Sequence, residues 1–128
     1  MGVMIDGVWH TVEPARNDAD GKFNNPDTAF RSWITADGSP GPTGDGGFKA
    51  APGRYHLYIC HACPWAHRTM IYRALKGLED AISVSVVHWY KGDDGWTFKP
   101  DDEVVPDPVL GAAYLHQIYK AADANFTG

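Results

Sequence analysis

The sequence predicts an α/β fold in which a helix joins two parallel strands, and three features of residues 54–128 carry that prediction. Two short runs rich in β-branched and aromatic residues, at 55–59 and 82–87, are typical of buried strands. Between them, apolar residues recur at helical spacing from Pro64 until Gly77, which is a stop signal. A further helical pattern follows a loop. The order strand, helix, strand, loop, helix implies a parallel pair with a crossover connection.

Residues 1–53 precede this unit, and Gly, Pro, Asn and Asp interrupt them throughout. The run from Thr35 to Gly47 cannot form a helix or a central strand, because proline lacks an N–H donor and glycine costs backbone entropy. A free linker would not need isolated aromatic residues, yet the region contains Trp9, Phe23, Phe30, Trp33 and Phe48. We therefore expect a coil arm that its rings attach to a folded body, with a disordered leader as the alternative.

The second half ends in a helical pattern after a polar loop that runs from about Trp89 to Pro108. The apolar residues of this last pattern are Leu110, Tyr114, Leu115, Ile118, Tyr119 and Ala122. Two parallel strands with two helices are half of a stable architecture, because parallel sheets need more strands and cover on both faces. The chain stops at Gly128, where another strand is expected. Residues 54–128 are thus predicted to form an incomplete domain.

Composition and charge indicate a globular chain of one domain and argue against nucleic acid and membrane as partners. The 128 residues suit one domain, and 44% hydrophobic with 21% charged residues are typical of a soluble globular chain. A net charge of −5 argues against a nucleic-acid partner, which requires a basic face. No apolar run approaches the roughly 18 residues of a membrane span, and the N-terminus has no secretion signal. We expect a cytoplasmic protein without a membrane partner, whose two cysteines are catalytic or inert.

Cys63 is the leading candidate for a reactive group. It lies between a predicted strand and a helix that begins at Pro64, where free N–H groups and the helix dipole favour a thiolate. His67 and Arg68 lie about one turn further along and add positive potential if they face the sulfur. A thiolate in this place is a competent nucleophile towards a disulfide, a conjugate or an electrophile. The alternative is a buried, inert cysteine at a strand end.

Cys60 and Cys63 also form a C-x-x-C motif. In a dithiol enzyme of the usual kind the resolving cysteine lies three residues beyond the nucleophile, and that position holds Ala66. We therefore interpret the site as a monothiol that requires an external thiol. A Cys60–Cys63 disulfide that switches the site off stays open. Zinc held by these cysteines and His61 is disfavoured, because no second pair of ligands is present at suitable spacing, so no metal is expected.

Trp96 is the other residue of interest. It follows the acidic loop Asp93–Gly95 and either closes over the core or forms one wall of a ligand pocket. The remaining isolated histidines are interpreted as structural or exposed to solvent: His10, His56, His88 and His116.

Taken together, these motifs resemble the glutathionyl-hydroquinone reductases, which are Xi-class glutathione transferases related to the omega class. The similarity covers essentially the whole chain and rests on several segments in order. They are IDGVW at 5–9, FRSW at 30–33, TADG at 35–38 through Gly47–Phe48, RYHLY at 54–58, ACPWAHRT at 62–69 and GWTF at 95–98.

The resemblance implies an arm, here residues 1–53, followed by a thioredoxin-like domain, here residues 54–128 and incomplete. It also implies an all-helical domain that comes next, forms a homodimer and is absent here. It implies that Cys63 attacks the sulfur of a glutathionyl-hydroquinone, and that a second glutathione resolves the mixed disulfide. It also implies that Trp96 packs on glutathione, the co-substrate.

Two departures from the family pattern stand out. Cys60 and His61 replace a serine and an apolar residue, and the strand with the cis-proline and the Glu-Ser pair that hold glutathione are missing. Two alternatives therefore accompany the reductase hypothesis: a monothiol, glutaredoxin-like thiol transferase, and an inactive truncated fragment.

Overall fold

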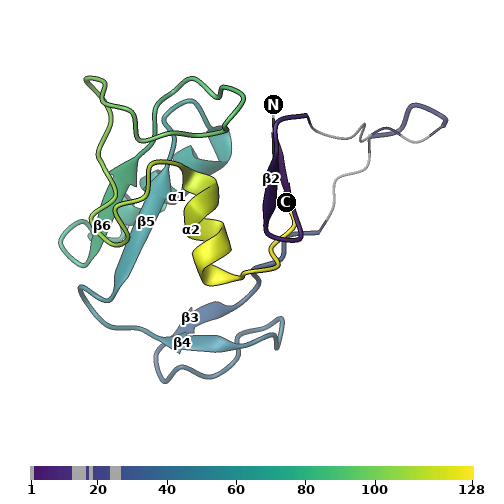
Figure 1. The fold of residues 1–128 in the computed structure, drawn as a ribbon. Helices are drawn as coiled ribbons and strands as arrows, with labels where there is room; N and C mark the ends of the chain where they lie inside the picture. The colour runs from purple at the N-terminus through teal and green to yellow at the C-terminus, as the bar shows by residue number, and fades with distance from the viewer. Residues whose placement is uncertain (1, 13–16, 18, 24–26) are drawn as a thin grey trace.

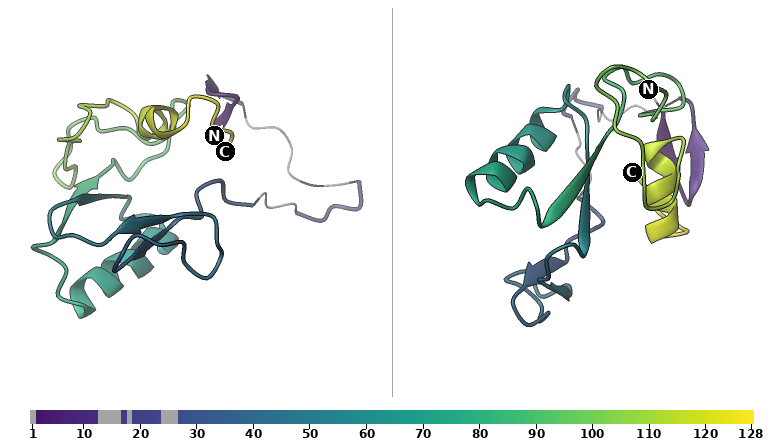
Figure 2. Two further views of the ribbon diagram at one scale, coloured as in Figure 1. Left: turned by 90° about the horizontal axis from the view of Figure 1, so that it is seen from below. Right: turned by 90° about the vertical axis from the view of Figure 1, so that its left-hand side faces the viewer.

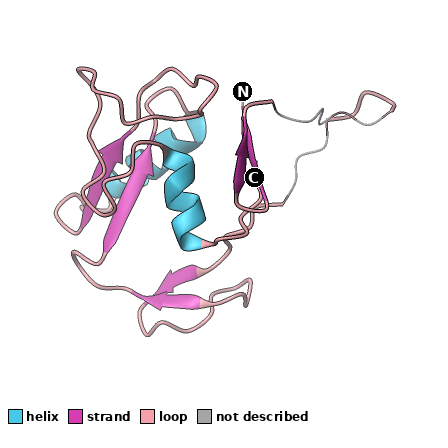
Figure 3. Cartoon of the chain, in the orientation of Figure 1, coloured by secondary structure: helices cyan, strands magenta, loops and turns pink. Residues whose placement is uncertain are grey.

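The computed structural model describes residues 2–12, 17, 19–23 and 27–128, and Figure 1 traces their path. These residues form six strands and two helices (Figure 3). In chain order the elements are β1 (Val3–Ile5), β2 (Val8–His10), β3 (Trp33–Thr35), β4 (Gly47–Lys49), β5 (Tyr55–Ile59), α1 (Pro64–Leu75), β6 (Ile82–Val86) and α2 (Leu115–Ala122).

The central unit is the parallel pair β5 and β6, with α1 in the crossover between them. The register runs from Tyr55 opposite Ile82 to Ile59 opposite Val86. Seen along the sheet, α1 lies on one side of the pair and α2 on the other (Figure 2). The predicted α/β class and its order of elements are confirmed. Because the strands are parallel, the segments after Ile59 and after Val86 leave the sheet at the same edge.

Local sequence signals determine both ends of α1. Pro64 occupies the first helical position, where its missing N–H breaks no helical hydrogen bond. At the other end Gly77 has a φ of +62°, and its N–H donates to the Ala74 carbonyl while Leu78 N–H donates to the Arg73 carbonyl. This pair of hydrogen bonds is a Schellman motif, which requires the left-handed conformation that glycine adopts without strain. The prediction that Gly77 stops the helix is thus confirmed.

The predicted start of the last helix was too early. Gly111 has a φ of +65°, and Tyr114 is extended, so α2 begins at Leu115 rather than near Leu110. The residues before the helix instead pair with the loop around residue 97: Phe98 N–H donates to the Ala113 carbonyl at 2.9 Å. The side-chain oxygen of Gln117 then accepts the N–H of Tyr114 and caps α2.

The N-terminal region contains more regular structure than the expected coil arm. β1 and β2 form a two-residue hairpin whose turn residues, Asp6 and Gly7, have φ values of 48° and 73°. Both values are positive, as a type I′ turn requires. The other edge of β1 pairs with the C-terminal segment, since Met4 and Gly128 exchange backbone hydrogen bonds of 2.9 and 3.0 Å. β3 and β4 form a separate parallel pair, on either side of the Gly- and Pro-rich run.

Aromatic rings attach part of this region to the body. Trp9 stacks on His116 with ring centroids 4.5 Å apart, and Phe30 stacks on Tyr119 and Phe126. Three other rings that were expected to anchor the region are exposed: Phe23, Trp33 and Phe48. Ring anchoring is therefore confirmed for two of the five aromatic residues. Residues 1, 13–16, 18 and 24–26 of the expected arm lie outside the described residues.

A buried polar network crosses the sheet. The Ser85 hydroxyl, fully buried, donates to the Pro106 carbonyl at 2.8 Å, so it accepts from His56 Nε2, also at 2.8 Å. The Nε2 atom therefore carries a proton. His56 Nδ1 lies 2.6 Å from the Ser83 hydroxyl and, in a neutral ring, accepts from it. His56 is thus structural, in line with the prediction for the isolated histidines.

We expect the stability of the protein to decrease as the pH falls through about 6.5, the ordinary pKa of an unfolded histidine. Burial lowers the pKa of His56 in the folded protein, against the opposing effect of the Asp107 charge. Between the folded and unfolded pKa values the unfolded chain binds more protons, so protonation favours unfolding. The stabilisation that neutral His56 provides is fully present above about pH 6.5, and it is lost as the pH falls from there towards the pKa of His56 in the folded protein.

Urea unfolding of the parent and His56→Gln at about pH 7.5 and about pH 5.5 measures this effect. The parent is expected to lose more stability on acidification than the variant. Equal losses in the two proteins would contradict a role of His56.

Candidate functional site

Cys63 is the residue that precedes α1, and it is half-buried. Its backbone is extended, with φ −96° and ψ 114°, and its side chain makes no capping hydrogen bond. The first hydrogen bond of the helix runs from His67 N–H to the Cys63 carbonyl at 3.1 Å. The N–H groups of Trp65 and Ala66 lie before this bond and point out of the helix end. The sulfur is therefore at the positive end of the helix dipole, and α1 has no acidic residue in its first turn.

The three residues proposed to support a thiolate are all exposed: Pro64, His67 and Arg68. Pro64 sets the direction of the helix. The guanidinium carbon of Arg68 lies 4.9 Å from the centroid of the Trp65 ring, so a cation–π contact holds this charge over the outer face of the helix. Arg68 is thus engaged by Trp65, whereas the first N–H groups of α1 lie next to Cys63 itself.

Cys60 occupies a different environment, although it is only three residues away. It is 5% exposed and belongs to a buried cluster with Val87 and Phe98. Its thiol lies 3.8 Å from the His88 carbonyl, to which it donates a weak hydrogen bond. Burial raises the pKa of the Cys60 thiol, and the charge of Cys63 acts in the same direction. Both cysteines are free thiols, and they differ in access, since Cys60 is buried and Cys63 is half-buried.

Trp96 lies in the loop that follows β6, at the same edge of the sheet as the cysteines. It is half-buried and packs against the cluster of Cys60, Val87 and Phe98, as Cys63 does. One buried cluster therefore supports both Cys63 and Trp96. The position at the carboxyl ends of parallel strands is where α/β proteins place their ligands.

The conformation of the loop around Trp96 depends on Gly95 and on Trp9 of the hairpin. Gly95 has a φ of +78°, and a Cβ there would lie 2.8 Å from the Trp9 ring. The Trp9 indole N–H donates to the Asp93 carbonyl at 3.0 Å and so fixes the loop from the hairpin side. Lys91 places its ammonium group 6.0 Å from the centroid of the Trp96 ring. Trp96 thus presents its ring beside a positive charge.

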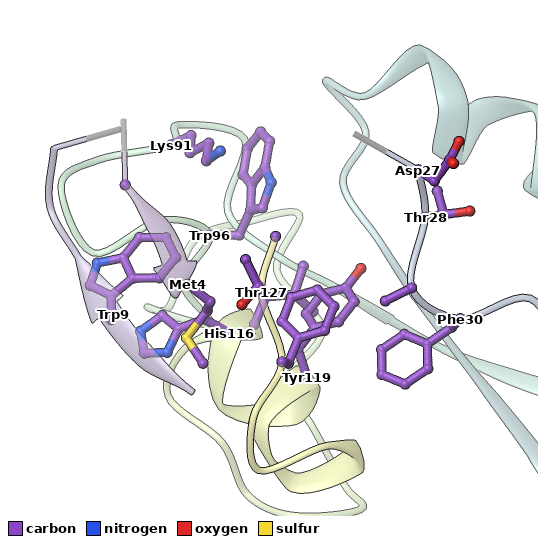
Figure 4. A pocket seen from close by; sticks show the side chains of 15 residues that line it. Met4, Trp9, Asp27, Thr28, Phe30, Lys91, Trp96, His116, Tyr119 and Thr127 are labelled. Atoms are coloured by element: carbon purple, nitrogen blue, oxygen red, sulfur yellow. The ribbon is translucent and has the colours of Figure 1, made fainter. Parts of the chain in front are cut away.

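A cavity of about 470 Å³ lies between the hairpin, α2 and the loop around Trp96 (Figure 4). Aromatic and apolar side chains form most of its wall: Met4, Trp9, Phe30, Trp96, Leu115, His116, Tyr119 and Phe126. Of the five predicted site residues, Trp96 lines this cavity, whereas Cys63, Pro64, His67 and Arg68 do not. Trp96 therefore lines a pocket, which is one of the two alternatives that the sequence left open.

Tyr119 provides an electrostatic link between the cavity and the cysteine. Burial raises the pKa of this tyrosine, and a negative charge at Cys63 raises it further. Tyr119 stacks on Phe126 with ring centroids 4.8 Å apart. Its hydroxyl is thus a neutral group within electrostatic range of Cys63.

Sequence reasoning missed the contributions of Trp9, Lys91, His116 and Tyr119 to this region. Tyr119 was assigned only to an apolar helix face, and His116 was interpreted as an isolated histidine. The Asp6–Gly7 pair between apolar residues was a usable signal, since it marks a hairpin that brings Trp9 back to the body.

Two features are absent from the described residues. These residues contain no group of three or more His, Cys, Asp or Glu side chains placed to hold a metal ion. Neither helix in the described part of the chain has the length and apolar content to cross a membrane.

Comparison with curated proteins finds relatives along the whole chain, although no protein-family model matches. The chain is 49% identical over 128 residues to glutathionyl-hydroquinone reductase PcpF of Sphingobium chlorophenolicum. It is 51% identical over 132 residues to glutathionyl-hydroquinone reductase YqjG of Escherichia coli. All of this chain is aligned in both cases, but it spans only 38% and 39% of the relatives' lengths.

Solved structures agree with these matches. The glutathione-bound structure of YqjG superposes with a TM-score of 0.81 and 48% identity, covering 99% of this chain and 36% of that one. The Xi-class glutathione transferase of Natrialba magadii gives a TM-score of 0.82 and 44% identity, covering 99% of this chain and 37% of that one.

Proposed function

Since the chain belongs to the Xi-class glutathione transferases, the class of the glutathionyl-hydroquinone reductases, we propose that it supplies the reactive-cysteine part of such a reductase. The thioredoxin-like fold class is confirmed by the same matches. The observation that carries the proposal is the contrast between the two cysteines. Cys63 is half-exposed at the N-terminus of α1, whereas Cys60 is sealed in the core.

The proposed reaction has two steps. The Cys63 thiolate attacks the sulfur of a glutathionyl-hydroquinone; the bond between sulfur and ring carbon breaks, and that carbon takes up a proton. The ring is reduced by two electrons, and the two sulfurs are oxidised to a Cys63–glutathione mixed disulfide. A second glutathione thiolate then attacks this disulfide, restores Cys63 and leaves as oxidised glutathione.

Trp96 is proposed to hold glutathione. Its half-buried ring faces a cavity and lies beside the ammonium group of Lys91, an arrangement suited to a peptide with carboxylate ends. The glutathione-bound structure of a relative supports binding of this co-substrate. Pro64, His67 and Arg68 are proposed to support the thiolate, with no metal taking part.

Further proposals concern the whole protein. We propose an arm at 1–53, an incomplete thioredoxin-like domain at 54–128, and a helical domain elsewhere that forms a homodimer in the cytoplasm. Exposed apolar side chains on α1 support a further domain, since Trp65 is 71% exposed and Ile71 and Leu75 are also open to solvent. Nucleic acid and membrane are not proposed as partners.

The names of the relatives favour the reductase over the glutaredoxin-like alternative. The test is a single turnover: the reduced chain is mixed with an equimolar glutathionyl-hydroquinone, without added glutathione. One equivalent of free hydroquinone per chain is expected. S-methylglutathione is expected to leave no glutathione on the chain, because its alkyl carbon is a poor leaving group. A chain that releases no hydroquinone is the inactive fragment, and a chain that acts only on glutathionylated proteins is the glutaredoxin-like enzyme.

A further inference from the structure

A tight turn brings the two cysteines together. Cys63 N–H donates to the Cys60 carbonyl at 3.0 Å, which closes a turn over His61 and Ala62. Residues at the two ends of such a turn have Cα atoms less than about 7 Å apart, and disulfides span about 4.4–6.8 Å. In addition, the Cys63 side chain packs against the buried cluster to which Cys60 belongs. The backbone therefore permits a disulfide between the two sulfurs without unfolding of β5 or α1.

The burial of Cys60 restricts its possible reaction partners. At 5% exposure, with its thiol directed to the His88 carbonyl at the end of β6, it is closed to molecules in solution. The half-exposed Cys63 is the neighbouring group through which an external sulfur compound reaches it. Cys60 is therefore expected to react only after Cys63 has reacted with an external compound.

We propose that Cys60 is a resolving cysteine, which attacks the mixed disulfide between Cys63 and glutathione and forms a Cys60–Cys63 disulfide. This inference rests on the proposed function, because Cys63 must first acquire a glutathionyl group. It changes the site from a monothiol to a dithiol in which the resolving residue precedes the nucleophile in the chain.

The step balances without a further oxidant. The Cys60 thiolate forms a bond to the Cys63 sulfur, the bond between that sulfur and glutathione breaks, and glutathione leaves as a thiolate that takes up the proton lost by Cys60. Two glutathione molecules then reduce the internal disulfide and leave as oxidised glutathione. The overall reaction is the same as for the monothiol route.

The electrostatics give the steps an order. Burial raises the pKa of Cys60, and a charged Cys63 raises it further, so Cys60 is the poorer nucleophile while Cys63 carries a charge. In the mixed disulfide Cys63 carries no negative charge, so that charge no longer raises the pKa of Cys60. Glutathionylation of Cys63 thereby activates the second thiol.

The test uses glutathione disulfide as the probe, which loads Cys63 without a quinone substrate. The reduced parent is mixed with glutathione disulfide and followed by intact mass after acid quenching. We expect the parent to end with a mass lower by two hydrogens, its glutathione adduct being transient. Cys60→Ser and Cys60→Ala are expected to retain the adduct at least about tenfold longer, and two variants guard against one failing to fold.

The outcomes distinguish the resolving role of Cys60 from the nucleophile role of Cys63. An adduct that persists equally in the parent and in both variants overturns the resolving role and leaves the nucleophile intact. Variants that acquire no glutathione, although their circular dichroism matches the parent, overturn the nucleophile proposal and this inference with it. Peptide mapping that places the internal disulfide at Cys60 and Cys63 supports it.

Discussion

The Cys63→Ser variant is expected to release hydroquinone in a single turnover at least about 1,000-fold more slowly than the parent. A serine hydroxyl is not ionised near neutral pH, and it cannot form a disulfide with the glutathionyl sulfur. The variant should therefore end with its mass unchanged, with neither a glutathione adduct nor a Cys60–Cys63 disulfide. The measurement combines the rate of hydroquinone release with the intact mass of the quenched protein.

Loss of the fold is not expected to confuse this result. Cys63 occupies the N-cap of α1 without a capping hydrogen bond, and serine is one of the residues preferred there. Ala62→Ser is the matched control, because it introduces the same side chain at an exposed position of the same turn. A Cys63→Ser protein that still acquires glutathione, on Cys60, would contradict the assignment of the nucleophile.

The Asp107→Ala variant is expected to lower the free energy of unfolding by about 3–5 kcal/mol. Asp107 is 6% exposed, and its carboxylate accepts the backbone N–H groups of Val109, Leu110 and Ala112 at 2.9–3.1 Å. The same carboxylate accepts the Tyr58 hydroxyl of β5 at 2.8 Å. Alanine removes the acceptor and leaves four partly buried donors without this partner. Each costs less than the roughly 1–3 kcal/mol of a fully buried group, so the expected loss is their sum.

Urea unfolding at neutral pH measures this loss, with Asp107→Asn as the control. Asparagine has the same shape and keeps one carbonyl acceptor, so it should lose roughly half as much stability. The shift of the Asp107 pKa agrees with this view. Burial acts to raise this pKa, yet hydrogen bonds from Ala112, Val109 and Tyr58 outweigh burial and hold it below its ordinary value. A loss below about 1 kcal/mol in the alanine variant would show that the turn rearranges around the missing side chain.

The proposed resolving role of Cys60 departs from the monothiol interpretation of the sequence. Sequence reasoning placed the second cysteine on the wrong side for a dithiol enzyme and therefore favoured a monothiol site. The structure adds a turn that joins the two residues and a core cluster that holds both side chains. Because disulfide formation depends on the distance between sulfur atoms and not on chain order, the spacing rule does not exclude the proposed disulfide.

Local signals were sufficient for the central unit. The strand at 55–59, the start of α1 at Pro64 and its end before Gly77 were predicted from residue types alone. These features depend on neighbours within about four residues along the chain, since a ring-locked φ or a positive φ acts on the adjacent hydrogen bonds. The position of Cys63 at the helix N-terminus belongs to the same class of prediction.

Only the tertiary structure determined the rest. The pairing of β1 with Gly128 joins residues more than 120 positions apart, and the Asp93 carbonyl meets the Trp9 indole across 84 positions. Cys60 is buried and Cys63 is only partly buried. This difference likewise depends on Val87 and Phe98, which come from other segments. Sequence alone determined where the strands and the helix of the central unit form and which cysteine precedes a helix, because neighbouring groups decide those features. Packing between distant segments decided which side chains are buried and which rings make contact. Burial is a property of all the atoms around a group, and neighbours in the chain supply only some of them.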